Sequence, residues 1–125
     1  MRMLVRLRHA ALIAVACAGL SGCLQAGADH QLIDRFFAAS RLRDRTALAR
    51  LATVIFEPHT DGIVDEFTIV SDTASGPDRR EVTIRARVRL AGAEARERQL
   101  VLTVSRAIGD QGHTAGNRWI ITGVR

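Results

Sequence analysis

Residues 81–90 read EVTIRARVRL and carry the clearest pattern in the chain, because apolar and polar residues alternate without a break. Successive side chains of a β-strand point to opposite faces of a sheet. The alternation therefore predicts a strand with one buried face and one solvated, basic face, as in an antiparallel sheet that is covered on one side. The buried face would hold Val82, Ile84, Ala86, Val88 and Leu90, and the solvated face Thr83, Arg85, Arg87 and Arg89.

Three further segments are predicted to be strands. Residues 62–72 (GIVDEFTIVSD) alternate, with Ile63, Asp65, Phe67 and Ile69 on one side and Val64, Glu66, Thr68 and Val70 on the other. Residues 96–108 and 118–125 follow the central strand, and turn residues separate all four segments, such as Gly76-Pro77 and the glycine-rich stretch 109–117. The order of these segments predicts a four-stranded meander.

The preceding residues have helical periodicity. From Asp29, an acceptable N-cap, a stripe of residues at spacings of three and four predicts an amphipathic helix. Its members are Leu32, Ile33, Phe36, Phe37 and Ser40, and a second stripe consists of Leu48, Leu51, Ala52 and Ile55. The phase changes near Arg43–Thr46, with Asp44 or Thr46 as the second cap, so we expect two helices or one bent helix that ends before Pro58.

The elements together predict one α+β domain over residues 30–125, with one or two N-terminal helices packed on a four-stranded antiparallel sheet. Residues 36–52 (FFAASRLRDRTALARLA) and 118–124 (RWIITGV) resemble the opening helices and the last strand of the cystatin-like and nuclear transport factor 2-like superfamily. That resemblance implies a cone-shaped pocket between helices and sheet. No third helix precedes the first strand here, so we expect the pocket to be shallow or missing.

The first residues have the pattern of a secretory signal. Three arginines lie within the first eight residues, and Ala10 to Leu20 form an apolar run of eleven residues. At 1.5 Å per residue the run covers about 16 Å, too little for a hydrocarbon core of about 30 Å. Residues 1–22 are therefore expected to be a signal peptide and not a membrane span.

The signal ends in LSGC (20–23), which resembles the lipobox of bacterial lipoproteins. The resemblance implies that Cys23 receives a diacylglyceryl group, becomes the first mature residue and is acylated with a chain such as palmitate; several chains anchor durably. Cys17 fits the pattern less well, because Ala14 stands where leucine is required. Residues 23–29 would form the lipidated end and a short flexible tether. The resemblance also implies that the residue after the cysteine influences sorting, and Leu24, which is not aspartate, favours the inner leaflet of an outer membrane, facing the periplasm. In a host with a single membrane the domain would face outward.

Charge and cysteine content argue against nucleic-acid binding, an internal disulfide bond and a thiolate metal site. All 18 Lys and Arg positions are arginine. From Cys23 onward the chain has 15 arginines and 13 acidic residues, a net charge of +2. No basic stripe with interleaved aromatic residues is present, so we expect no nucleic-acid partner. Cleavage before Cys23 would leave one cysteine, which allows neither an internal disulfide bond nor a thiolate metal site.

Candidate catalytic residues are few. Enzymes of the resembled superfamily place Asp or His inside the cone, which suggests Asp65 as a base and His59 with Asp61 at the mouth. The alternative is that Asp65 lies solvated near a strand end. Glu57, His59 and Asp61 alternate and could approach a metal ion, but such a loop is more typical of a surface turn. We expect no metal and no cofactor.

The arginine row Arg85, Arg87 and Arg89 is a candidate interaction face. It could bind an anion, a lipid headgroup, a protein partner or a second copy of the chain. Glu97 and Gln99 would lie on the neighbouring strand, so cross-strand ion pairs on an open sheet face explain the row more simply.

The sequence therefore predicts a lipid-anchored bacterial envelope protein with a non-catalytic binding domain. The alternatives are a small periplasmic enzyme or ligand carrier with a cone-type pocket, and an accessory to outer-membrane assembly. This last alternative is an analogy of location and size only.

Overall fold

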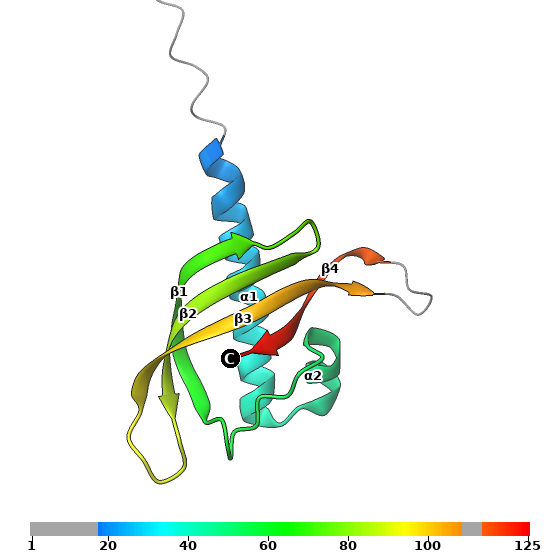
Figure 1. Ribbon diagram of the computed structural model, residues 1–125. Helices are drawn as coiled ribbons and strands as arrows, with labels where there is room; N and C mark the ends of the chain where they lie inside the picture. The colour runs from blue at the N-terminus through cyan, green and yellow to red at the C-terminus, as the bar shows by residue number, and fades with distance from the viewer. Residues whose placement is uncertain (1–17, 109–113) are drawn as a thin grey trace, which may run out of the picture.

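The computed structural model describes residues 18–108 and 114–125, which form two helices followed by a four-stranded sheet (Figure 1). Neighbouring strands are antiparallel, and their order in the sheet is their order in the chain. The predicted α+β class and the meander are confirmed. The elements are α1 (Ala18–Leu42), α2 (Arg45–Leu51), β1 (Ile63–Ala74), β2 (Arg79–Arg89), β3 (Arg96–Ile108) and β4 (Thr114–Val124).

The core lies between one face of the sheet and α1, which crosses that face (Figure 1). The alternation predicted for β2 is confirmed, since Val82, Ile84, Ala86 and Val88 are all buried. From α1, the predicted stripe supplies Ile33, Phe36 and Phe37, each at most 1% exposed. Both helices cover the same face, because α2 and the chain after it pack against this core as well. The other face carries the arginine row.

α1 begins eleven residues before the predicted N-cap. Asp29 lies inside the helix and is buried, so its prediction as a cap is wrong. Residues 24–28, expected as a flexible tether, are helical in the structure. The side chain of Asp29 does not accept a hydrogen bond from a backbone N–H group at a helix start. It forms an ion pair with Arg80 in the sheet.

The break between the helices lies where the phase of the pattern changes. Arg43 adopts a left-handed conformation (φ 53°) and ends the first helix. Asp44 caps the second helix, because its carboxylate accepts a hydrogen bond from the backbone N–H of Ala47 at 3.0 Å. Of the two caps predicted, Asp44 is the one used.

α2 ends at Leu51, earlier than the second apolar stripe predicts. Ala52 turns to an extended conformation and pairs with Ile121 of β4, and the backbone N–H of Thr53 donates to the carbonyl of Ile121 at 2.9 Å. Ile55 therefore lies outside the helix and is 77% exposed, which corrects its prediction as a core residue. Phe56 takes its place in the core, with its ring centroid 5.3 Å from that of Phe37.

β1 departs from simple alternation at a β-bulge. Val64 is opposite Val88 and Glu66 is opposite Arg87, so Asp65 is an extra residue without a partner in the register. The bulge shifts the phase, and Val64 and Phe67 consequently both pack with the core. The prediction that Asp65 shares the inward side with Phe67 is therefore wrong.

Candidate functional site

Cys23 lies in α1, six residues before Asp29. Most of the predicted signal peptide, residues 1–17, falls outside the described residues. Among the residues that the structure does describe, no helix combines the length and the hydrophobicity needed for a membrane span. Processing and lipidation at Cys23 stay predictions from the sequence.

Asp65 is exposed at the bulge of β1. Its carboxylate Oδ2 lies 3.5 Å from Nε of Arg89, and both side chains are about half exposed, at 42% and 51%. A base for proton transfer needs a position within hydrogen-bonding reach of a bound substrate. Asp65 has instead an ion-pair partner at the surface, which fits the solvated alternative.

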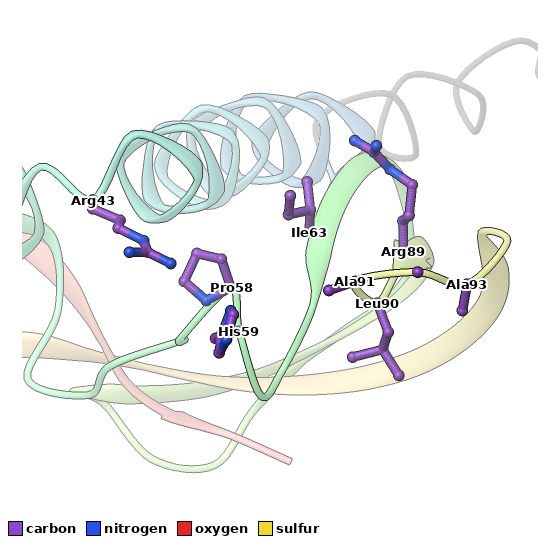
Figure 2. Close-up of a pocket in the computed structure, with 9 residues that line it drawn as sticks. Arg43, Pro58, His59, Ile63, Arg89, Leu90, Ala91 and Ala93 are labelled. Carbon is purple, nitrogen blue, oxygen red and sulfur yellow. The ribbon is translucent and has the colours of Figure 1, made fainter.

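His59 lies in a small hollow between the chain before β1 and the β2–β3 turn (Figure 2). This His59 hollow has a volume of about 230 Å³, and its walls include Arg43, Pro58 and Ile63. Figure 2 shows Arg43 and His59 on one side and Arg89 on the other, with the Arg89 guanidinium turned away from His59. Asp65 is not among the lining residues, so the structure does not bring the two catalytic candidates together.

Glu57 and Asp61 stabilise their own loop. The backbone N–H of Glu57 donates to Oδ2 of Asp61 at 2.7 Å, and Oε1 of Glu57 lies 3.8 Å from Arg43. Within the described ranges, no three His, Cys, Asp or Glu side chains are grouped as ligands for a metal ion. The alternation of Glu57, His59 and Asp61 thus corresponds to a surface turn.

The arginine row lies on the open face of the sheet, opposite acidic side chains. Arg87 faces Glu97 and Arg85 faces Gln99 in the β2–β3 register, as predicted. Nε of Arg85 lies 3.4 Å from Oε1 of Glu97, and on the β1 side Glu66 is opposite Arg87. With the Arg89–Asp65 pair, three arginines face three carboxylates. The row is therefore part of a mixed-charge face and not an anion-binding patch.

Two larger hollows lie on either side of the chain between α2 and β1. The helix groove, about 490 Å³, has apolar walls from Leu48, Ala49 and Ala52 of α2. The sheet hollow, about 700 Å³, lies against the end of β2, the start of β3 and the end of β4. Val88 and Leu100 are among its lining residues. The sheet hollow is the nearest counterpart of the cone-type pocket that the sequence resemblance implies.

A buried charge cluster at the other end of the sheet was not predicted. Arg80 of β2 donates a hydrogen bond to Oδ1 of Asp29, and its Nη1 lies 3.8 Å from Oδ2 of Asp72 in β1. Two guanidinium groups lie over the Trp119 ring, with Cζ of Arg80 4.6 Å and Cζ of Arg106 4.9 Å from the ring centroid. The cluster thereby joins α1 to all four strands.

Burial raises the pKa of Asp29 to about 7, and the neighbouring Asp72 adds to the shift while Arg80 opposes it. Perturbed carboxyl groups often mark active sites. Asp29 and Arg80 line none of the three hollows described above, however, and the cluster packs helix against sheet. Its evident role is to hold α1 in place.

A sequence signal for this cluster did exist. The inward alternation of β2, carried back one step from Val82, reaches Arg80. The stripe of α1, carried back four residues from Ile33, reaches Asp29. Both charged residues therefore occupy core positions of their elements, and their opposite charges satisfy the rule that buried charges are paired.

Comparison with protein families, curated proteins and solved structures finds no match to this chain.

Proposed function

We propose that this protein is a lipid-anchored bacterial envelope protein whose single domain binds a partner and does not catalyse a reaction. The observation that carries the anchor is the LSGC motif directly after a basic segment and an eleven-residue apolar run. Leu24 after the lipidated cysteine supports the inner leaflet of an outer membrane, with the domain in the periplasm. We further propose that the domain is of the nuclear transport factor 2-like or cystatin-like kind.

The open face of the sheet supports a binding role. Both helices cover the opposite face, and at the β2–β3 turn end of the open face Arg85, Arg87, Glu97 and Gln99 are all exposed. Three arginines alternate there with carboxylates from the neighbouring strands. Such a mixed-charge surface suits a protein partner or a second copy of the chain, because complementary charges fix register and suppress wrong partners.

A small-molecule carrier is a second candidate, and the sheet hollow favours it. Its volume of about 700 Å³ is within the range of ligand sites, and it combines apolar walls with Arg98 and Asp61. In this case the ligand would enter between the sheet and the chain that follows α2.

The anchor can be tested by metabolic labelling with an alkyne fatty acid in a bacterial host that has two membranes. Wild-type protein and the matched Cys17→Ser variant should both become labelled and fractionate with the outer membrane. Cys23→Ser should lose the label and keep its unprocessed mass. Label that persists in Cys23→Ser would overturn the anchor.

The binding face can be tested by site-specific photo-crosslinking in intact cells. A photoreactive residue at Gln99, on the open face, should form one discrete adduct, whereas one at Thr46 on exposed α2 should not. Arg87→Glu should abolish the Gln99 adduct by introducing like charge beside Glu66 and Glu97. Unchanged adducts in Arg87→Glu, or adducts at Thr46 alone, would contradict binding at this face.

A further inference from the structure

The buried charge cluster determines where the proposed lipid anchor lies relative to the domain. Asp29 is 2% exposed and is joined to Arg80, and next to it the ring of His30 stacks on Phe67 at 4.6 Å. Cys23 is six residues earlier in the same helix, so its backbone lies about 9 Å along the helix axis from Asp29. An anchor at Cys23 is therefore attached to the sheet through a short helical segment and not through a flexible tether.

The same end of the sheet faces in the direction of Cys23. Asp29 contacts Arg80 at the start of β2 and is close to Asp72 near the end of β1. In an antiparallel meander, the end of β3 and the start of β4 lie at this end too, as the pairing of Arg79 with Ser105 shows. Figure 1 shows the N-terminal half of α1 leaving the sheet beside the β1–β2 hairpin.

This anchor end, defined as residues 75–79 and Arg118, carries two exposed arginines. Arg79 and Arg118 make no ion pair with any carboxylate of the described residues. Asp78, the one acidic residue of the anchor end, is engaged by Arg106 at 2.8 Å. The two guanidinium groups are therefore available to an external anion.

We propose that the anchor end lies against the membrane, and that Arg79 and Arg118 bind anionic phospholipid headgroups. The inference rests on the proposed lipid anchor at Cys23. An arginine near an anionic bilayer surface contributes favourably to binding, and a guanidinium group matches the geometry of a phosphate. Held in this orientation, the domain would present its β2–β3 end away from the bilayer.

Trp119, the single tryptophan, reports this orientation because it lies in the cluster at the anchor end. The full chain with Cys17→Ser is coupled through Cys23 to a maleimide lipid and reconstituted into vesicles with dansyl-labelled headgroups. Energy transfer from Trp119 should be stronger than transfer in the variant Trp119→Phe with Ala93→Trp, which moves the donor to the β2–β3 turn. Equal or weaker transfer from Trp119 would overturn the orientation.

The arginines are tested by the binding of the full Cys17→Ser, Cys23→Ser chain to vesicles. All variants keep residues 1–22, the predicted signal peptide. The ratio of the vesicle partition coefficients of variant and parent therefore reports the effect of the arginines alone. On phosphatidylglycerol-containing vesicles, Arg79→Gln with Arg118→Gln should bind on the order of twentyfold more weakly. Arg45→Gln with Arg96→Gln, a matched pair of exposed arginines away from this end, should bind as the parent does.

On pure phosphatidylcholine vesicles the two pairs of variants should bind equally. Equal loss for both pairs on anionic vesicles, or no loss for either, would refute the headgroup contact. Absence of fatty-acid label at Cys23 in cells would overturn the proposed anchor. The chemically coupled chain would still test the orientation, so the two failures are distinguishable.

Discussion

The guanidinium Nη2 of Arg80 donates a hydrogen bond to Oδ1 of Asp29 and so joins β2 to α1 across 51 residues of the chain. Both side chains are buried, at 9% and 2% exposure. A buried pair is costly to break because the remaining buried charge loses much of its compensation.

Asp29→Ala is therefore expected to lower the free energy of unfolding by about 3 kcal/mol. Urea denaturation followed by circular dichroism measures this change. The control is Glu97→Ala, which removes a surface partner of Arg85 and should cost less than about 1 kcal/mol. Equal losses in the two variants would show that the buried pair contributes no more to the free energy of unfolding than a surface pair does.

The stability of the domain should depend on pH through Asp29. The pKa of Asp29 is about 7 in the folded chain against 3.8 as its ordinary value. In this window the folded chain keeps a proton that the unfolded chain has lost, so the free energy of unfolding falls as the pH rises from about 4 through about 7.

The isosteric variant Asp29→Asn removes this titration and provides the reference. The stability of the wild type relative to Asp29→Asn should decrease from pH 5 to pH 8, by at most about 1.4 kcal/mol per pH unit. Urea denaturation of both proteins at each pH checks the sign. Parallel stability curves would mean that Asp29 does not titrate there.

Gly62, directly before β1, is required by both conformation and space. Its φ is +94°, and a Cβ atom would lie 2.7 Å from Cγ1 of Val88. Gly62→Ala should lower the free energy of unfolding by about 2–3 kcal/mol. Gly92→Ala has a similar φ of +75° but open space around it, so it should cost only about 1 kcal/mol. Urea denaturation of both variants separates the clash from the backbone strain.

Ile55 and Phe56 are neighbours with opposite environments. Phe56→Ala opens a cavity beside Phe36 and Phe37, and we expect a loss of about 3–4 kcal/mol in thermal or urea unfolding. Ile55→Ala removes a side chain that is 77% exposed, and its effect should stay within about 0.5 kcal/mol. A larger loss for Ile55→Ala would mean that Ile55 is covered in solution.

The bounds of β2 and β3 could be predicted to within about two residues, because a strand buried on one face repeats every two residues. The same holds for the α1 stripe and for Asp44 as a cap, since both depend on residues within a turn or two of each other. The position of Glu97 and Gln99 on the strand beside the arginine row followed from the meander order and was also confirmed.

The candidate site was less accessible to prediction. Asp65 was placed on the same side as Phe67 because alternation was assumed to continue, whereas the bulge between Val64 and Glu66 turns it outward. His59 and Asp65 are close in sequence, yet the structure does not bring them to one cavity. The periodicity of a single strand cannot indicate a bulge, because the extra residue is defined only by pairing with the neighbouring strand.

The sequence by itself determined the fold class, the meander order and the predicted anchor motif, because each depends on residues adjacent in the chain or on a repeating pattern. Only the tertiary structure decided three other features. These are the end of α2 at Leu51, the outward position of Asp65 and the pairing of Asp29 with Arg80. Each results from contact with a partner distant in sequence, and the free energy of that contact outweighs the local preference.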